Sequence, residues 1–463
     1  MIEPITTVNP ATGITIAAHP ALTTDQIEDC LANTHATARH WAATPLSDRL
    51  AALRSLATAL RADKDTYASM ITREMGKPIA EATAEIEKCA VTADYYADHA
   101  GHMLADEPVN MGGSETRAWV AYEPAGVVLA VMPWNFPFWQ VMRFAVPTLA
   151  AGNGVVLKHS PNVTGCALAI EELLRRSGFP EGLLTALVVA EPEVPATIEH
   201  LVGDDRIAAV TLTGSNRAGA AVGAAAGRRV KKAVLELGGS DPFIVLDDAD
   251  LDAATTAAVK ARFTNCGQSC VCAKRLLVAD SVADQFTRLF VDKTRDLVVG
   301  DPNDPTTQVG PLARADLRIQ VDDQVVRSVA QGARLLTGGQ SIDKPGYFYE
   351  PTVLSEVRPG MAVFDEETFG PVAAISSAAT DADLAQLADT SPYGLGLSVW
   401  TADPQRAVAL ARRITSGAVF VNAIVASDPR LPFGGTKHSG YGRELATAGL
   451  REFTTIRSYW VQQ

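Results

Sequence analysis

The sequence predicts an α/β protein built around a mostly parallel sheet, and three observations support this fold class. The first is an alternation of apolar strand segments with helical patterns through the middle of the chain. The strand segments lie near 127–132, 154–158, 184–189 and 207–212, and helical patterns lie near 137–151, 163–177, 193–202 and 215–226. The second is length, because 463 residues suffice for two or three domains. The third is composition, because 47% apolar residues exclude a disordered chain.

Alternating strands and helices imply right-handed βαβ units, whose sheets bind ligands at the carboxyl ends of their strands. Before this region, the N-terminal quarter is expected to be helical. Its leucines at 50, 53, 56 and 60 recur at helical spacing, and a second helical pattern runs from about 79 to 97. Residues 118–123 are expected to form a strand, followed by a turn at 124–126.

A second α/β region is expected to begin near Ser240 and to extend to about 430. It opens with a strand at 243–246 and a helix at 251–263. The tail, 453–461 (FTTIRSYWV), has the composition of a strand. A terminal apolar strand usually pairs with another element, and a partner subunit is one candidate.

Charge and composition exclude several classes of protein. The formal net charge is -13, which disfavours general nucleic-acid binding because phosphate contacts need clustered cations. No apolar run approaches the roughly 20 residues that span a bilayer, so no membrane association is expected. The start has no basic region followed by an apolar one, and six cysteines are too few for a disulfide scaffold. A cytoplasmic protein with free thiols is therefore expected.

Phosphate-binding motifs are weak in this sequence. No G-x-G-x-x-G follows any predicted strand. The G-x-x-x-x-G at 214–219 is followed by Ala220 and Ala221, where a P-loop needs Lys and Ser or Thr. The segment 213–215 (TGS) remains, between a strand and a helix. Its backbone N–H groups could meet a phosphate at the helix start, or the segment is an ordinary turn.

Three cysteines fall within the segment 263–275 (FTNCGQSCVCAKR), at Cys266, Cys270 and Cys272. One interpretation is a nucleophilic thiol, which needs a lowered pKa or a nearby base. A second interpretation is a set of buried apolar cysteines. A metal site is disfavoured, because no histidine lies nearby and structural zinc needs a fourth ligand.

Two further motifs end predicted strands. In 133–137 (PWNFP), Asn135 offers an N–H donor that suits an oxyanion, although a local turn could use the same group. In 236–239 (ELGG), the Glu236 carboxylate could act as a base or cap the next segment.

These motifs, together with 366–372 (EETFGPV) and 432–444 (PFGGTKHSGYGRE), resemble the aldehyde dehydrogenase superfamily in order and spacing over essentially the whole chain. The resemblance implies a Rossmann-type cofactor domain from 1–112 and 127–238 and an α/β catalytic domain from 239–448. It also implies a small β bridging element from 113–126 and 449–463, which joins subunits into a homodimer or homotetramer.

The resemblance implies an oxidation of a small-molecule aldehyde to an acid. Cys270 matches the nucleophile, which forms a thiohemiacetal and then a thioester. Asn135 and the backbone N–H of Cys270 match the oxyanion donors, and Glu236 matches the base that activates water.

The resemblance also assigns nicotinamide-cofactor contacts. The matching positions are Trp134, Lys158, Ser160, Gly214, Ser215, Leu237, Glu367 and Phe369. Relatives that prefer NAD often have a glutamate three residues after the lysine, where this chain has Pro161. The unopposed Lys158 favours NADP, with NAD as the alternative, although many NADP-preferring relatives have serine at the position of Pro161.

Within the superfamily, the chain is most similar to succinate-semialdehyde dehydrogenases. Arg143 and Ser427 match the residues that bind the substrate carboxylate there, and a structural ion pair is the alternative role for Arg143. Some members have a second arginine six residues before the nucleophile, where this chain has Thr264. The pair Cys270 and Cys272 resembles members in which these thiols form a regulatory disulfide.

Other functions stay open at this point. Broad aldehyde specificity and glutarate semialdehyde are the nearest alternatives, because one methylene changes binding by only about 1–3 kcal/mol. Acyl transfer to coenzyme A is disfavoured by the presence of Glu236. A non-catalytic structural protein on the same scaffold is the alternative from another class.

Overall fold

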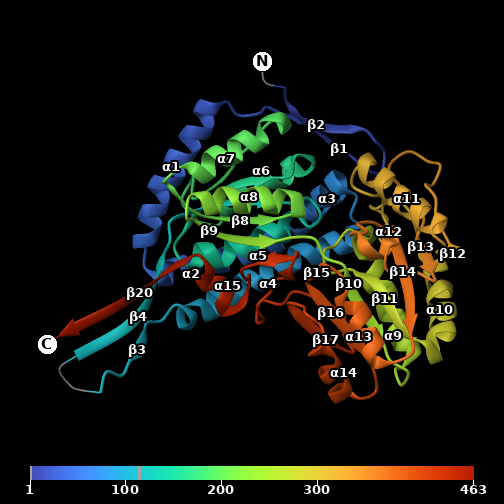
Figure 1. Cartoon of the computed structure of the whole chain (residues 1–463). Helices are drawn as coiled ribbons and strands as arrows, with labels where there is room; N and C mark the ends of the chain where they lie inside the picture. The colour runs from blue at the N-terminus through green and yellow to red at the C-terminus, as the bar shows by residue number, and fades with distance from the viewer. Residues whose placement is uncertain (1–2, 113–115, 463) are drawn as a thin grey trace.

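The computed structural model describes residues 3–112 and 116–462. It has two α/β lobes that meet along central helices, and an arm of three strands that projects from the first lobe (Figure 1). The chain opens with an antiparallel hairpin of β1 (Ile5–Val8) and β2 (Thr15–His19). The predicted helices of the N-terminal quarter follow and are confirmed: α1 (Thr24–Ala43), α2 (Leu46–Ala62), α3 (Lys64–Met75) and α4 (Ile79–Met103).

The first lobe contains the predicted parallel sheet. Its order is β19-β9-β8-β5-β6-β7, and all pairs are parallel except the one with β19 (Gly440–Tyr441). The parallel strands are β5 (Val127–Met132), β6 (Gly154–His159), β7 (Leu184–Ala186), β8 (Ile207–Thr213) and β9 (Lys232–Glu236). The helices between them are α5 (Pro137–Ala150), η1 (Pro161–Val163), α6 (Thr164–Arg176), η2 (Glu191–Glu193), α7 (Val194–Gly203) and α8 (Asn216–Arg228).

The strand order of this sheet reverses beside β5. The chain adds β6 and β7 on one side of β5 and then β8 and β9 on the other. Loops that leave the two sides of such a switch point diverge, and a crevice opens at the carboxyl ends of the strands. The predicted segments 133–137 and 213–215 follow β5 and β8 and therefore lie at this crevice.

The second lobe is built on a seven-stranded sheet of order β12-β13-β14-β11-β10-β16-β17, parallel except at the β12–β13 edge. Its strands are β10 (Asp241–Val245), β11 (Ala273–Ala279), β12 (Arg334–Thr337), β13 (Thr352–Ser355), β14 (Val372–Ala378), β16 (Gly396–Trp400) and β17 (Ala418–Val421). Its helices are α9 (Leu251–Phe263), η3 (Thr264–Gly267), α10 (Asp280–Arg295), α11 (Ala315–Ala330), α12 (Ala362–Asp365), α13 (Asp381–Asp389) and α14 (Pro404–Ala411). A short pair, β15 (Tyr393–Gly394) and β18 (Thr436–Lys437), completes it.

Helix α5 is the buried platform between the sheet of the first lobe and α4. All of its residues are buried, because its sequence is apolar almost all round. A helix enclosed on every side holds its side chains in fixed positions. The residues that precede and line α5, Asn135 and Arg143, therefore stand on a rigid base.

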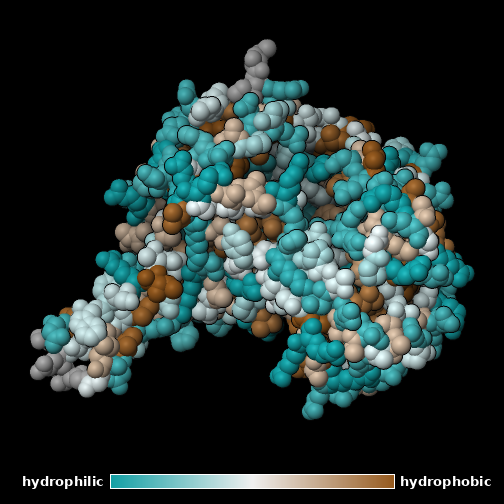
Figure 2. Space-filling view, in the orientation of Figure 1, coloured by the Kyte–Doolittle hydropathy of each residue, from teal (hydrophilic) through white to brown (hydrophobic). Residues whose placement is uncertain are grey.

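The arm is a three-stranded antiparallel sheet of order β20-β4-β3. It pairs β4 (Thr116–Pro124) with β3 (Glu107–Val109) and with β20 (Thr454–Gln462), which follows α15 (Ala446–Glu452). The predicted strands at 118–123 and in the tail are thus confirmed. Apolar side chains lie along the arm (Figure 2). On β20, Ile456 and Trp460 are 66% and 63% exposed.

Two strands cross the domain boundaries expected from the sequence. β3 lies within 1–112 but belongs to the arm, and β19 lies within 239–448 but pairs with β9 of the first lobe. Both crossings follow from backbone hydrogen bonding between segments distant in the sequence, which local patterns do not encode. Residues 113–115 of the predicted bridging segment lie outside the described residues.

Candidate active site

The loop that carries Cys270 is held in an unusual backbone conformation. Asn265, Cys266 and Gly267 have φ of +54°, +55° and +70°, in the left-handed region. Such residues cost free energy, on the order of 1–3 kcal/mol each for non-glycine types, and need surrounding contacts to persist. A side chain at Gly267 would collide with the carbonyl of Gly370. The loop is therefore fixed by close packing against the second lobe.

Hydrogen bonds tie this loop to the segment that follows β5. The Asn265 side chain donates to the carbonyl oxygen of Asn135 at 2.8 Å, and Asn135 Nδ2 donates to the carbonyl of Gln268 at 3.1 Å. Glu81 of α4 accepts the backbone N–H of Asn265 at 2.7 Å. Asn135 and the loop of Cys270, far apart in the sequence, are thus in direct contact, with one Asn135 N–H left for a ligand.

Cys270 is half-buried beside the motif that follows β9. A side chain at Gly239 would lie 2.5 Å from the Cys270 carbonyl oxygen, so only glycine permits this approach. Burial raises the pKa of the Cys270 thiol to about 12, while the charges of Arg143 and Lys274 act to lower it. The thiol is therefore protonated at neutral pH in this structure and needs a base before it can attack.

Glu236 ends β9 and is buried. Burial raises the pKa of this carboxyl group well above its usual range, and the buried carboxyl group of Glu444 raises it further. Arg143 acts in the opposite direction. A carboxyl group with a raised pKa can take up a proton near neutral pH, as a general base must.

Arg143 does not present a free guanidinium to the crevice. Its Nε forms an ion pair with Glu444, and the two side chains are 2% and 1% exposed. Its Nη2 donates to Thr213 Oγ1 at 3.3 Å, and the guanidinium carbon lies 4.6 Å from the centre of the Phe433 ring. The structure thus contains an ion pair of the kind that we gave as the alternative to substrate binding by Arg143.

Ser427 lies in the loop between β17 and β18 and is half-buried. Its hydroxyl accepts a hydrogen bond of 2.7 Å from Lys88 Nζ of α4. Lys88 in turn lies over the Trp139 ring of α5, at 4.3 Å from the centroid. Ser427 is therefore joined to α4 and α5 by a second cation, Lys88, that the sequence did not single out.

The predicted cofactor residues surround the crevice from both lobes. Trp134 and Phe369 pack edge to face, with ring centroids 5.6 Å apart. Ser215 caps α8 by accepting the backbone N–H of Ala218 at 3.3 Å, and Gly214 and Leu237 follow β8 and β9. Glu367 is held by Lys274 at 2.7 Å and by the backbone N–H of Gly239 at 3.0 Å.

Lys158 lies near the carboxyl end of β6, at the edge of the crevice, and is 8% exposed. Burial lowers the pKa of its ammonium group, and Glu191 of η2 raises it. Ser160 donates to Asn162 Oδ1 at 2.7 Å. None of the three residues after Lys158 is acidic, yet the fold brings Glu191 near it.

The remaining cysteine prediction concerns Cys272. It is buried beside β11, and all six cysteines of the chain are unpaired. The regulatory disulfide between Cys270 and Cys272 stays a prediction.

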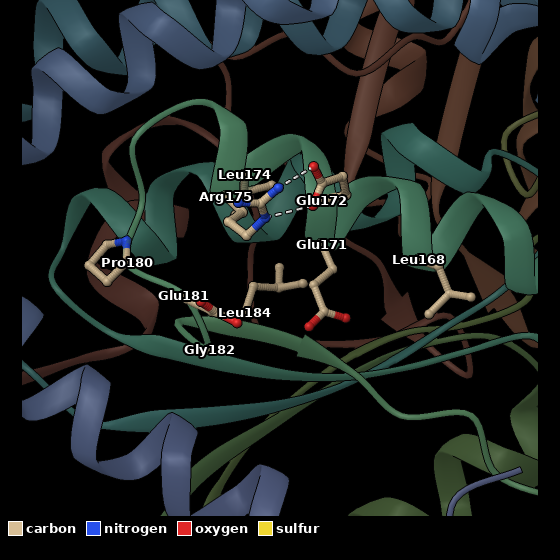
Figure 3. Close-up of a pocket in the computed structure, with 9 residues that line it drawn as sticks. All are labelled: Leu168, Glu171, Glu172, Leu174, Arg175, Pro180, Glu181, Gly182 and Leu184. Atoms are coloured by element: carbon tan, nitrogen blue, oxygen red, sulfur yellow. Dashed lines mark hydrogen bonds and ion pairs between the residues drawn. The ribbon is translucent and has the colours of Figure 1, made fainter.

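A surface hollow between α6 and β7 is separate from these residues (Figure 3). Its wall includes Glu171, Pro180 and the ion pair of Arg175 with Glu172 at 2.6 Å. None of the predicted site residues lines it.

Among the described residues, no helix has both the length and the apolar content to cross a membrane.

Comparison with known proteins agrees with this geometry. The family model for the aldehyde dehydrogenase family matches residues 2–459. The chain belongs to the aldehyde dehydrogenase family. It is 48% identical over 453 residues to an Escherichia coli (strain K12) protein named succinate semialdehyde dehydrogenase (NAD(P)+) Sad, covering 98% of this chain and 97% of that protein.

Other relatives in the family are similar in extent. The chain is 45% identical over 459 residues to succinate-semialdehyde dehydrogenase (NADP(+)) 1 of Mycobacterium tuberculosis (strain H37Rv), covering 99% of this chain and 100% of that protein. A crystal structure of succinic semialdehyde dehydrogenase from Streptococcus pyogenes with NADP+ is 36% identical. It aligns with a TM-score of 0.95 over 100% of both chains. The predicted fold class and family are confirmed.

Four charged residues at this aldehyde dehydrogenase site escaped the sequence reasoning: Lys88, Glu191, Lys274 and Glu444. A signal existed for Lys88, which lies three residues after the buried Glu85 and four before the buried Thr92, on one face of α4. A charged residue on an otherwise buried helical face needs a partner or a function. Glu444 is the last residue of the motif at 432–444, but the sequence pattern predicted no role for it.

Proposed function

We propose that this chain oxidises succinate semialdehyde to succinate, with NADP favoured over NAD. The observation that supports the proposal is that the loop of Cys270 contacts both Asn135 and the segment that follows Glu236, in a chain of the aldehyde dehydrogenase family. The choice of aldehyde is supported by relatives at 45–48% identity that are named for this substrate.

The reaction divides into two steps on Cys270. The Cys270 thiol first loses its proton to water in the crevice, and the thiolate then adds to the aldehyde carbon. Asn135 Nδ2 and the backbone N–H of Cys270 bind the oxyanion. Bound NADP supplies the acceptor for the hydride that leaves this carbon. Glu236 then removes a proton from the water that hydrolyses the thioester, and its raised pKa suits that transfer. Covalent attachment separates oxidation from hydrolysis.

The residues present fit a phosphorylated dinucleotide. The buried ammonium group of Lys158 needs an anion, since burial already lowers its pKa. Ser215 and Gly214 stand at the N-terminus of α8, where backbone N–H groups bind phosphate. Ser160, Trp134, Leu237, Glu367 and Phe369 complete the proposed contacts. Glu191 opposes a phosphate at Lys158, so the proposed NADP preference is moderate.

We also assign 1–112 with 127–238 to cofactor binding and 239–448 to catalysis. The segments 113–126 and 449–463 are assigned to assembly as a homodimer or homotetramer. The exposed Ile456 and Trp460 on the arm support assembly, because exposed apolar strands usually pair with a partner. The unpaired cysteines are consistent with the proposed cytoplasmic location.

The test compares kcat/KM for succinate semialdehyde and for butanal, each with NADP and with NAD. The proposal expects a strong preference for the semialdehyde and a higher value with NADP. Equal values for the two aldehydes would reduce the function to a general aldehyde dehydrogenase. Glutarate semialdehyde, included as a third substrate, tests the alternative with one more methylene.

A further inference from the structure

Lys274, the second residue of β11, is a buried cation that contacts three segments of the candidate active site. Its side chain is 1% exposed. Its ammonium group donates to the carboxylate of Glu367 at 2.7 Å, to the carbonyl oxygen of Cys270 at 3.3 Å and to the carbonyl oxygen of Gly239. An ammonium group has three N–H donors, and here each has an acceptor. Lys274 therefore acts on groups of the protein and not on a ligand.

The three acceptors come from segments that are distant in the sequence. Gly239 ends the motif after β9, Cys270 lies in the loop before β11, and Glu367 lies in the motif before β14. The backbone N–H of Gly239 also donates to Glu367, at 3.0 Å. Both bonds to Glu367 end on Oε1, and its side chain is 20% exposed. Oε2 can therefore accept a hydrogen bond from a hydroxyl group of the cofactor while Oε1 stays in place.

The positive charge of Lys274 needs an explanation beyond hydrogen bonding. Removing an ammonium group from water costs free energy that a partly exposed carboxylate recovers only in part. A neutral side chain could donate to the carbonyl oxygens of Gly239 and Cys270 without that cost. A function that needs the charge itself is the simplest reason for a lysine here.

The charge acts on the thiol of Cys270. Burial raises the pKa of this thiol to about 12, Arg143 of α5 and Lys274 of β11 lower it, and Glu367 and Asp241 raise it. Of the two cations, Lys274 is the one that forms a hydrogen bond with the residue that carries the thiol. Its position next to the nucleophile is therefore fixed by geometry as well as by charge.

We propose that Lys274 is a positioning residue that joins the nucleophile Cys270 to Glu367, one of the proposed cofactor contacts. Its bond to the Cys270 carbonyl fixes the main chain that carries the thiol, and its charge favours the thiolate. Its bond to Glu367 fixes the carboxylate that receives the cofactor. The inference rests on the proposed roles of Cys270 and Glu367, and it does not depend on which aldehyde is the substrate.

The first experiment measures how fast iodoacetamide alkylates Cys270 in the cofactor-free enzyme at about pH 8, with peptide mass spectrometry as the readout. Below the thiol pKa, the fraction of thiolate falls tenfold for each unit by which that pKa rises. A neighbouring opposite charge shifts a pKa by about one to three units. Lys274→Met, which keeps the length of the side chain but removes its charge, is therefore expected to slow alkylation about 10-fold or more.

The matched control is Lys293→Met on α10, at the outer edge of the second lobe (Figure 1). Like Lys274, Lys293 bonds a carboxylate and a backbone carbonyl, both of Asp252, at 2.7 Å and 2.8 Å. Its replacement removes a similar set of bonds without changing the charge beside Cys270. Alkylation in this control is expected to stay within about twofold of the wild-type rate.

Glu367→Gln tests the same charge in the opposite direction. Glutamine keeps the volume of the side chain but removes the negative charge that offsets Lys274 and raises the pKa of the thiol. Alkylation of Cys270 is therefore expected to become about 10-fold faster. A loosened site would change the rate in the same direction in both variants, so opposite changes identify the effect of charge. This variant also keeps the test decisive if Lys274→Met does not fold.

The second experiment measures the dissociation constant for NADP without an aldehyde. Lys274→Met is expected to raise it about 3- to 10-fold, as for one lost hydrogen bond, because Glu367 loses its anchor. An alkylation rate that stays at the wild-type value in Lys274→Met, or one that falls in Glu367→Gln, would overturn the effect on the thiol. Unchanged NADP binding would overturn the link through Glu367. Neither readout uses the semialdehyde, so either failure is distinguishable from a wild-type enzyme that does not oxidise it, which would overturn the proposed function instead.

Discussion

Replacing Glu444 by glutamine tests the electrostatic control of the proposed base. Glutamine keeps the volume of the side chain and can still accept a hydrogen bond from Arg143, but it removes the negative charge beside Glu236. Both carboxyl groups are 2% exposed, so the surroundings screen their interaction weakly. Neighbouring unit charges that shift a pKa typically lie within about 4–6 Å, and at an effective dielectric constant of about 20 they interact by about 3–4 kcal/mol, or about two to three pH units.

The direction follows from the role of Glu236. A general base works in its deprotonated form, so the rate of hydrolysis rises with pH through the pKa of Glu236. Glu444 raises that pKa and Arg143 lowers it. Glu444→Gln is therefore expected to move the acidic limb of the hydrolysis rate to lower pH by about one to two units.

The assay separates the two steps. The initial burst of reduced cofactor reports oxidation, and the steady rate after it reports hydrolysis. Glu452→Gln is the matched control, because Glu452 pairs with Lys232 at 3.2 Å at the opposite end of β9. An acidic limb that stays in place in Glu444→Gln, or that moves equally in the control, would refute the reasoning.

Three further changes test other parts of the site. Lys158→Ala is expected to lower the ratio of kcat/KM with NADP to that with NAD about 10- to 100-fold, as expected for a lost charge-assisted bond to phosphate; an unchanged ratio contradicts that role. Arg143→Ala is expected to lower the free energy of unfolding by about 3–5 kcal/mol and to impair both aldehydes, because it leaves buried Glu444 unpaired. Wild-type stability with a loss confined to the semialdehyde would argue against this. Peroxide is expected to inactivate the wild-type enzyme by forming a disulfide between Cys270 and Cys272, which needs local backbone movement, and a thiol reductant is expected to restore the activity. The Cys272→Ala variant is expected not to recover, and equal recovery of the two enzymes would exclude the disulfide.

The sequence was sufficient to predict the site residues that lie at the end of a strand or just after it. Asn135 and Ser215 lie within three residues after β5 and β8, and Glu236 is the last residue of β9. Strands of one parallel sheet present such residues at one edge of the sheet. The alternation of strands and helices therefore predicted both the first sheet and the place of its site.

Pairings between distant segments could not be predicted in this way. Lys88 meets Ser427 across 339 positions of the chain, and Arg143 meets Glu444 because β19 pairs with β9. Such contacts depend on how whole elements pack, which no local pattern specifies. The sequence predicted a substrate role for Arg143 and left a structural ion pair as the alternative, but it could not name Glu444 as the partner.

The most direct test of the account is the chemical state of Cys270 in a Glu236→Gln variant. Mixed with succinate semialdehyde and NADP, this variant is expected to reduce one cofactor per active site and then stop. Peptide mass spectrometry is expected to find a succinyl thioester on Cys270, and none in a Cys270→Ala control. Continued turnover, or an acyl group on another residue, would contradict the proposed roles of Cys270 and Glu236.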